Sequence, residues 1–61
     1  MTLLRAIEKF LRAHRMAPTR FGRDAAGDPR LVTDLRRGRE MRPRTEARLR
    51  AFMAARDGEV A

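Results

Sequence analysis

Six residue types are absent from this 61-residue sequence: cysteine, serine, tyrosine, tryptophan, asparagine and glutamine. Without cysteine the chain has neither a disulfide nor a thiolate–zinc site, so helix packing or self-association must stabilise the small core of so short a chain. One histidine, His14, is too few for a metal cluster, and no nucleophile–base set is present. We therefore expect a protein that is not an enzyme and that uses no metal, cofactor or small-molecule substrate.

A long apolar segment is also missing. No uncharged apolar run approaches the roughly 18 residues that are needed to span a bilayer. The N-terminal residues lack the apolar core of a signal peptide. We therefore expect a cytoplasmic protein with no membrane partner.

Positive charge dominates the composition. Fourteen arginines and Lys9 stand against eight acids, which leaves a net charge of +7. An excess of arginine over lysine is also typical of GC-rich genomes, so the positions of the charges are more informative than their type. Between Arg30 and Arg50, eight arginines stand against three acids, a local charge of +5. This excess predicts a polyanionic partner: nucleic acid is the interpretation that we favour, and an anionic membrane surface is the alternative.

The N-terminal half has the apolar spacing of two helices. A first helix is predicted over 3–14, with Thr2 as its N-cap. We expect His14 to cap or cover the end of this helix. A second helix is predicted over 18–26, because proline suits the first helical position. The apolar stripe of the first helix consists of Leu3, Leu4, Ile7, Phe10, Leu11 and His14.

A third helix is predicted directly after the second. Gly27 is a C-cap candidate, while Asp28 and Pro29 suit the N-cap and first position of a helix over 29–37. Gly38 would close this helix. Its predicted buried stripe consists of Leu31, Val32 and Leu35.

A fourth helix is predicted over 44–55, after a connector in which Pro43 stops one element or starts the next. Residues 57–61 are predicted to form a frayed tail beyond a single domain over 1–56. The expected fold is all-α, a compact bundle of four or five short helices. The residues of the fourth helix expected to turn inward are Ala47, Leu49, Phe52 and Met53.

Gly22 is an unusual residue for the middle of a short helix, where glycine costs roughly 1 kcal/mol relative to alanine. We interpret it as a point where another helix crosses too closely for a Cβ atom; a tolerated surface glycine is the alternative. Close packing beside a tight turn at Gly27 is typical of a helix-turn-helix. In that motif the first helix crosses the DNA backbone and the second lies in the major groove.

The stretch TRFGRDAAGDPRLVTDLRRGREMRP resembles the helix-turn-helix of Cro/C1-repressor-type regulators of bacteria and phages. The resemblance extends over roughly residues 3 to 55. It departs from the family pattern in two places. Gly38 follows Gly27 by eleven positions, one fewer than usual, and Pro18 and Thr19 stand where the family has a phosphate-binding Gln or Ser. The matching residues are Phe21 and Gly22, the turn glycine Gly27, the group Val32, Leu35, Arg37, Gly38 and Arg39, and Pro43.

The resemblance implies a small DNA-binding transcription regulator, associated with the nucleoid, that acts as a homodimer or with a partner regulatory protein. Base contacts are expected from the outward residues of the third helix, which are Arg30, Thr33, Asp34 and Arg37. Phosphate contacts are expected from Thr19, Arg20, Arg36, Arg39, Arg42 and Arg44. An ion pair between Asp34 and Arg30, four residues apart, is the alternative role for that acid.

Other classes of protein are also consistent with a basic helical chain. One is a small adaptor or antitoxin-like module whose basic face binds an acidic protein. Another is a protein that lies on a membrane surface, although its arginines are spread over several elements. Phe52 and Met53 would provide a dimer surface unless they complete the core of one chain.

The absence of asparagine and glutamine leads to a prediction about the DNA sequence. These residues are the usual bidentate readers of adenine, whereas arginine bonds to guanine O6 and N7. Selection of bound duplexes from a random pool should therefore return guanines at the contacted positions. Selected sites in which only A·T pairs are critical would contradict this expectation.

Overall fold

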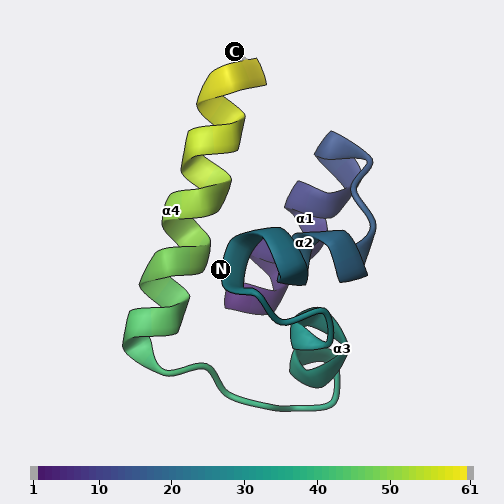
Figure 1. Cartoon of the computed structure of the whole chain (residues 1–61), viewed down its shortest axis with the longest axis vertical. Helices are drawn as coiled ribbons and strands as arrows, with labels where there is room; N and C mark the ends of the chain where they lie inside the picture. The colour runs from purple at the N-terminus through teal and green to yellow at the C-terminus, as the bar shows by residue number, and fades with distance from the viewer. Residues whose placement is uncertain (1, 61) are drawn as a thin grey trace.

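The computed structural model describes the backbone of residues 2–60 and the side chains of residues 2–58. This part of the chain is all-α, as predicted, and contains no strand. Within it, no helix has the length and apolar character that crossing a membrane requires. Figure 1 shows α4 along one side of the molecule and the three shorter helices packed beside it. The helices are α1 (Leu3–His14), α2 (Pro18–Ala26), α3 (Leu31–Arg36) and α4 (Pro43–Val60).

The ends of α1 and α2 confirm the predicted bounds of both helices. Thr2 caps α1, because its hydroxyl accepts a hydrogen bond of 3.2 Å from the backbone N–H of Arg5. At the other end Arg15 adopts a left-handed conformation with φ 50°. Gly27 ends α2 with φ 66°, a conformation that glycine adopts without a steric cost.

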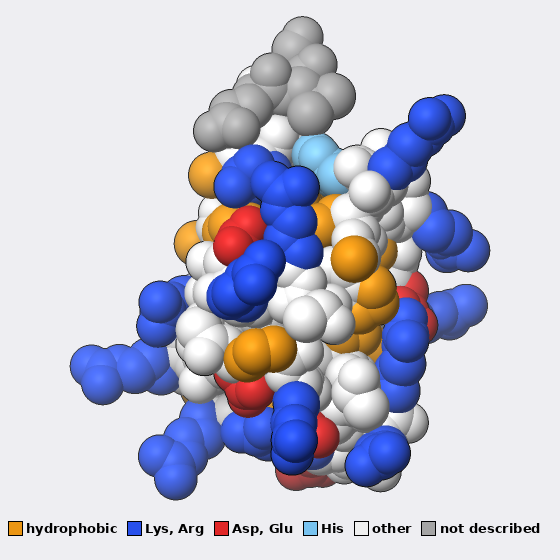
Figure 2. All heavy atoms as spheres, turned by 45° about the vertical axis from the view of Figure 1, so that its right-hand side comes forward, with side chains coloured by type: hydrophobic (Ala, Val, Ile, Leu, Met, Phe, Trp, Pro, Cys, Tyr) orange, Lys and Arg blue, Asp and Glu red, His pale blue; other side chains and the backbone are white. Residues whose placement is uncertain are grey.

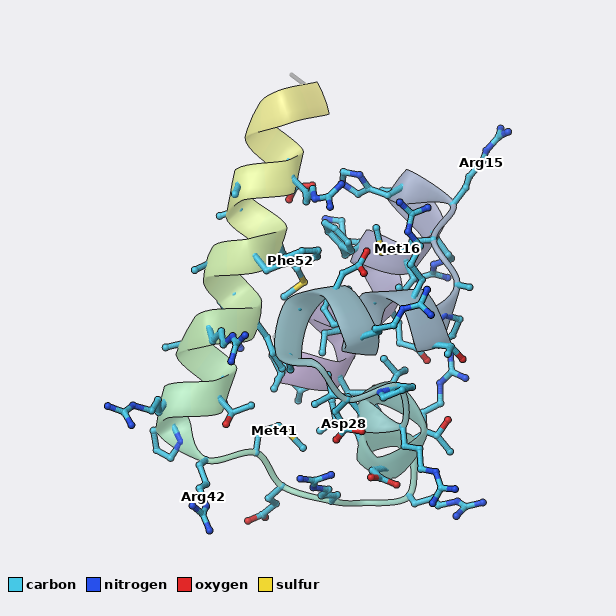
Figure 3. The ribbon with its side chains drawn as sticks, in the orientation of Figure 1. Arg15, Met16, Asp28, Met41, Arg42 and Phe52 are labelled. Atoms are coloured by element: carbon cyan, nitrogen blue, oxygen red, sulfur yellow. The ribbon has the colours of Figure 1, made fainter. Side chains whose placement is uncertain are left out.

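The core lies where the four helices meet, and phenylalanine rings join three of them. The ring of Phe10 on α1 is 5.5 Å from that of Phe21 on α2, which is 5.6 Å from that of Phe52 on α4. Figure 3 shows Phe52 directed from α4 toward these helices. Phe52 and Met53 therefore pack within one chain and do not form an exposed dimer surface. The buried core residues are Ile7, Phe10, Leu11, Phe21, Ala25, Leu31, Val32, Leu35, Leu49 and Met53.

The predicted start of the third helix is wrong by two residues. The carboxylate of Asp28 accepts a hydrogen bond of 3.0 Å from the N–H of Arg30, and its carbonyl accepts one of 3.1 Å from Leu31. These bonds close a turn, so helical structure begins only at Leu31 and ends at Arg36. The connection between α2 and α3 is therefore a four-residue turn rather than an immediate restart at Pro29.

The fourth helix is longer than predicted. It begins at Pro43 and continues to Val60, so the segment expected to be a frayed tail is helical as far as the structure describes it. Residue 61 lies outside the described residues. Ala47 is exposed, contrary to expectation. It lies about 200° around the helix from Leu49, which points into the core.

The close approach predicted at Gly22 is confirmed, but the nearest neighbour is the backbone of the α2–α3 turn rather than a crossing helix. A Cβ atom on Gly22 would lie 2.1 Å from the carbonyl oxygen of Asp28 and 3.2 Å from the Cβ of Leu31. The first of these atoms belongs to the backbone of the turn, so it has no rotamer that would relieve a clash. Only glycine at this position allows the turn and the start of α3 to pack on α2.

Two glycine-to-alanine substitutions should have opposite effects on stability. Gly22→Ala forces the turn away from α2 and should lower the free energy of unfolding by about 1–3 kcal/mol or more, as overpacking does. Gly58→Ala, in α4, would place a Cβ with no described atom within 4 Å and should raise the free energy of unfolding by up to about 1 kcal/mol, because alanine favours the helix. Urea denaturation monitored by circular dichroism measures the free energy of unfolding of each variant. Equal changes in the two variants would contradict the close approach at Gly22.

Candidate nucleic-acid interface

The α3 helix has one face in the core and one in solvent. Leu31, Val32 and Leu35 are buried and attach the helix to α2 and α1. Arg30, Thr33 and Arg37, by contrast, are exposed. Their spacing of three and four residues places them along one side of α3 and its flanking turns. We call these three residues the α3 stripe.

The connector after α3 adds positive charge beside this helix. Arg42 and Arg44 are exposed and belong to none of the ion pairs among the described side chains. Figure 3 shows Arg42 projecting away from the molecule at the bend into α4. Met41 is half-buried and packs against the core, so it anchors the connector between α3 and α4.

The start of α2 carries two of the predicted phosphate contacts, Thr19 and Arg20, both exposed. Ala17 occupies the N-cap position and provides no side-chain hydrogen bond. The first N–H groups of a helix attract anions when no side chain covers them. Arg20 is 3.4 Å from Asp24 on the next turn, a long contact between exposed groups that restrains the guanidinium only weakly.

Asp34 is paired, but its partner differs from the expected one. It lies 2.9 Å from Nη1 of Arg39, and no pair with Arg30 is present among the described side chains. The same Nη1 atom lies 3.4 Å from the carboxylate of Asp28. Arg39, a predicted phosphate contact, thus joins two acids, and Asp34, a predicted base contact, is engaged by it.

Arg36 is also engaged within the protein. Its guanidinium donates two hydrogen bonds to the carboxylate of Glu8 on α1, of 2.7 and 3.2 Å. These bonds are the main reason why the pKa of Glu8 is lowered, and they raise the pKa of Arg36. The pair ties α3 to α1 and turns this predicted phosphate contact toward the neighbouring helix.

His14 covers the end of α1, as expected, and also connects it to α4. Its ring stacks on Phe10 with 4.1 Å between centroids, and Nε2 lies 2.7 Å from a carboxylate oxygen of Asp57. Only 12% of the side chain is exposed. Within the part of the chain described, no group of three or more His, Cys, Asp or Glu residues is arranged to hold a metal.

The ten predicted contact residues therefore fall into two groups. Seven are exposed and, within the side chains described, free of strong ion pairs: Thr19, Arg20, Arg30, Thr33, Arg37, Arg42 and Arg44. Three are engaged within the protein: Asp34, Arg36 and Arg39. Sequence reasoning missed the partners Glu8 and Asp28, which are 28 and 11 residues from the arginines they bind. Helical periodicity carries no signal for such distant pairs.

Comparison of the chain with protein-family models, with curated proteins and with solved structures gives no match. Figure 2 shows Lys and Arg side chains projecting around one face of the molecule, with acidic side chains between them. The features of this chain that bear on function are therefore the placement of these charges and the turn that presents α3.

The ion pair between Glu8 and Arg36 predicts a pH-dependent contribution to stability. Because the pKa of Glu8 is lower in the folded chain, the contribution is present above the ordinary value of 4.5 and is lost as the pH falls through the folded pKa. Glu8→Gln should therefore lower the melting temperature near neutral pH, and the difference from the unmodified chain should shrink in acid. Glu40→Gln is the control, since Glu40 belongs to no ion pair among the described side chains. If the difference in melting temperature between Glu8→Gln and the unmodified chain did not change with pH, a stabilising ion pair between Glu8 and Arg36 would be contradicted.

Proposed function

We propose that this chain binds double-stranded DNA sequence-specifically, with α3 in the major groove. The observation that supports this most directly is the junction of α2 with α3. The carbonyl of Asp28 packs against Gly22, so the turn holds α3 closely on α2. The buried side of α3 is apolar, and its opposite side carries the α3 stripe. A helix supported in this way on a basic protein suits insertion into a groove.

The α3 stripe provides the base contacts in this proposal. Arg30 and Arg37 each carry the planar fork that matches guanine O6 and N7. Thr33 has a methyl group suited to contact with the thymine methyl. The position of Asp34 on the helix would allow it to accept a hydrogen bond from cytosine N4. Its ion pair with Arg39 makes it less suited to that contact.

Phosphate contacts on both sides of α3 would position the stripe. Thr19 and Arg20 lie at the uncapped start of α2, while Arg42 and Arg44 lie where the connector joins α4. These side chains would contact the DNA backbone without reading its sequence. Each phosphate neutralised by an arginine releases counterions, so binding should weaken steeply with salt.

We propose that the protein acts as a small bacterial or phage-like transcription regulator, associated with the nucleoid. One α3 helix contacts too few base pairs to select a single site in a genome. Two copies on inverted half-sites, about one DNA turn apart, would supply the missing specificity. A partner regulatory protein would serve the same purpose.

A groove beside α1 supports a second candidate function, that of an adaptor for an acidic protein. It has a volume of about 640 Å³ and lies between α1, the start of α2 and the end of α3. Leu4, Met16 and Pro18 give it an apolar lining, and Arg5 and Arg12 add positive charge. This candidate does not require the close packing at Gly22.

Single substitutions should separate base contacts from phosphate contacts. Arg30→Ala should cost about 1–3 kcal/mol of binding free energy at one base position and relax the preference there. Arg42→Ala should weaken binding to all sequences and reduce the slope of log K against log salt by about 1. Fluorescence anisotropy with a duplex selected from a random pool, at several salt concentrations, measures both effects.

Arg15→Ala is the matched control, because it removes the same charge from the end of the molecule opposite Arg42 (Figure 3). It should leave the affinity and the salt slope nearly unchanged. If Arg15→Ala and Arg42→Ala reduced the affinity for DNA equally, the cause would be a general effect of charge rather than a contact at an interface. If the unmodified chain enriched no duplex over random DNA, DNA binding would be refuted and the adaptor function favoured.

A further inference from the structure

Arg39 stands out among the arginines near α3 because it faces two acids. Its Nη1 atom lies 2.9 Å from a carboxylate oxygen of Asp34 on α3 and 3.4 Å from one of Asp28 in the turn. Its backbone N–H also donates a hydrogen bond of 3.0 Å to the carbonyl of Asp34. Half of the Arg39 side chain is exposed, and about a third of each acid.

The two acids lie next to the α3 stripe in the sequence and in space. Asp34 follows Thr33 directly, and the other carboxylate oxygen of Asp28 accepts from the N–H of Arg30. DNA that approached the stripe would bring its phosphates within a Debye length, roughly 8–10 Å, of both carboxylates. If the two carboxylates were unpaired, they would repel the phosphates. Together with the guanidinium of Arg39, the group has a charge of −1 instead of −2.

We infer that Arg39 supports DNA binding by neutralising these two carboxylates, chiefly Asp34 at 2.9 Å and more weakly Asp28 at 3.4 Å, and that it is a positioning residue rather than a phosphate contact. This inference rests on the proposed function. A move of the guanidinium to a phosphate would leave two acids unpaired beside the DNA, and their repulsion of the phosphates would offset the gain from the new contact. Arg42 and Arg44 have no such partners among the side chains that the structure describes, so they are available to phosphate.

A double-mutant cycle tests this inference. Binding to the selected duplex is measured for the unmodified chain, Arg39→Met, Asp28→Asn with Asp34→Asn, and all three changes together. If Arg39 acts through the acids, Arg39→Met alone weakens binding about fivefold or more, and the two asparagines restore most of the loss. The two changes are then coupled rather than additive. The triple variant also keeps the salt slope of the unmodified chain.

Arg42→Met combined with the same two asparagines is the matched control and should be additive. Melting temperatures of all variants show whether any loss of binding follows from unfolding. If Arg39→Met does not fold, Arg39→Gln replaces it in the same cycle, because glutamine removes the charge but keeps a hydrogen-bond donor, and the same coupled or additive outcomes apply.

Additive effects in the cycle, or a triple variant whose salt slope is smaller by about 1, would overturn the inference and assign Arg39 to phosphate. In that case the proposed DNA binding would still stand, because the unmodified chain binds. If the unmodified chain bound no duplex, both the proposed function and this inference would be refuted at the first measurement.

Discussion

The contact between Gly22 and the backbone of Asp28 is the constraint on which the arrangement of α3 depends. A helix can be held at a fixed angle by side chains, which tolerate repacking, or by backbone atoms, which do not. Here the carbonyl of Asp28 occupies the place of a missing Cβ atom. The same residue orders the turn through the N–H groups of Arg30 and Leu31. Asp28 thus affects both features: its carboxylate helps to set where α3 begins, and its backbone carbonyl sets how closely the turn packs on α2.

The other helices contribute to this arrangement through the core. Apolar residues of α3 pack against the cluster built around Phe10 and Phe21. The ion pair with Glu8 attaches the end of α3 to α1. The pair between His14 and Asp57 attaches α1 to α4. The exposed side of α3 therefore belongs to a unit whose helices are connected to one another. Such a preorganised surface loses less conformational entropy when a partner binds.

Sequence patterns predicted the elements whose causes are local. The cap at Thr2, the proline that begins α2 and the left-handed glycine at Gly27 are each decided by neighbouring residues, and the bounds of α1 and α2 were correct. The predicted start of α3 was wrong because the carboxylate of Asp28 bonds within the turn instead of capping a helix. Aspartate is favoured in both positions, so the sequence alone does not distinguish them. The pairing of Arg39 with Asp28 and Asp34 depends on the folded path of the chain, which no helical period encodes.

The aromatic cluster has a consequence for spectroscopy. The sequence contains three phenylalanines and neither tryptophan nor tyrosine, and all three rings lie in the contact between α1, α2 and α4. Aromatic signals from this protein therefore report on the joining of those three helices. The α3 helix carries no chromophore, so a ligand bound there is seen in the near ultraviolet only if its effect reaches the core. A tryptophan introduced elsewhere would be the only residue excited at wavelengths that phenylalanine does not absorb, so no tryptophan or tyrosine would have to be removed first.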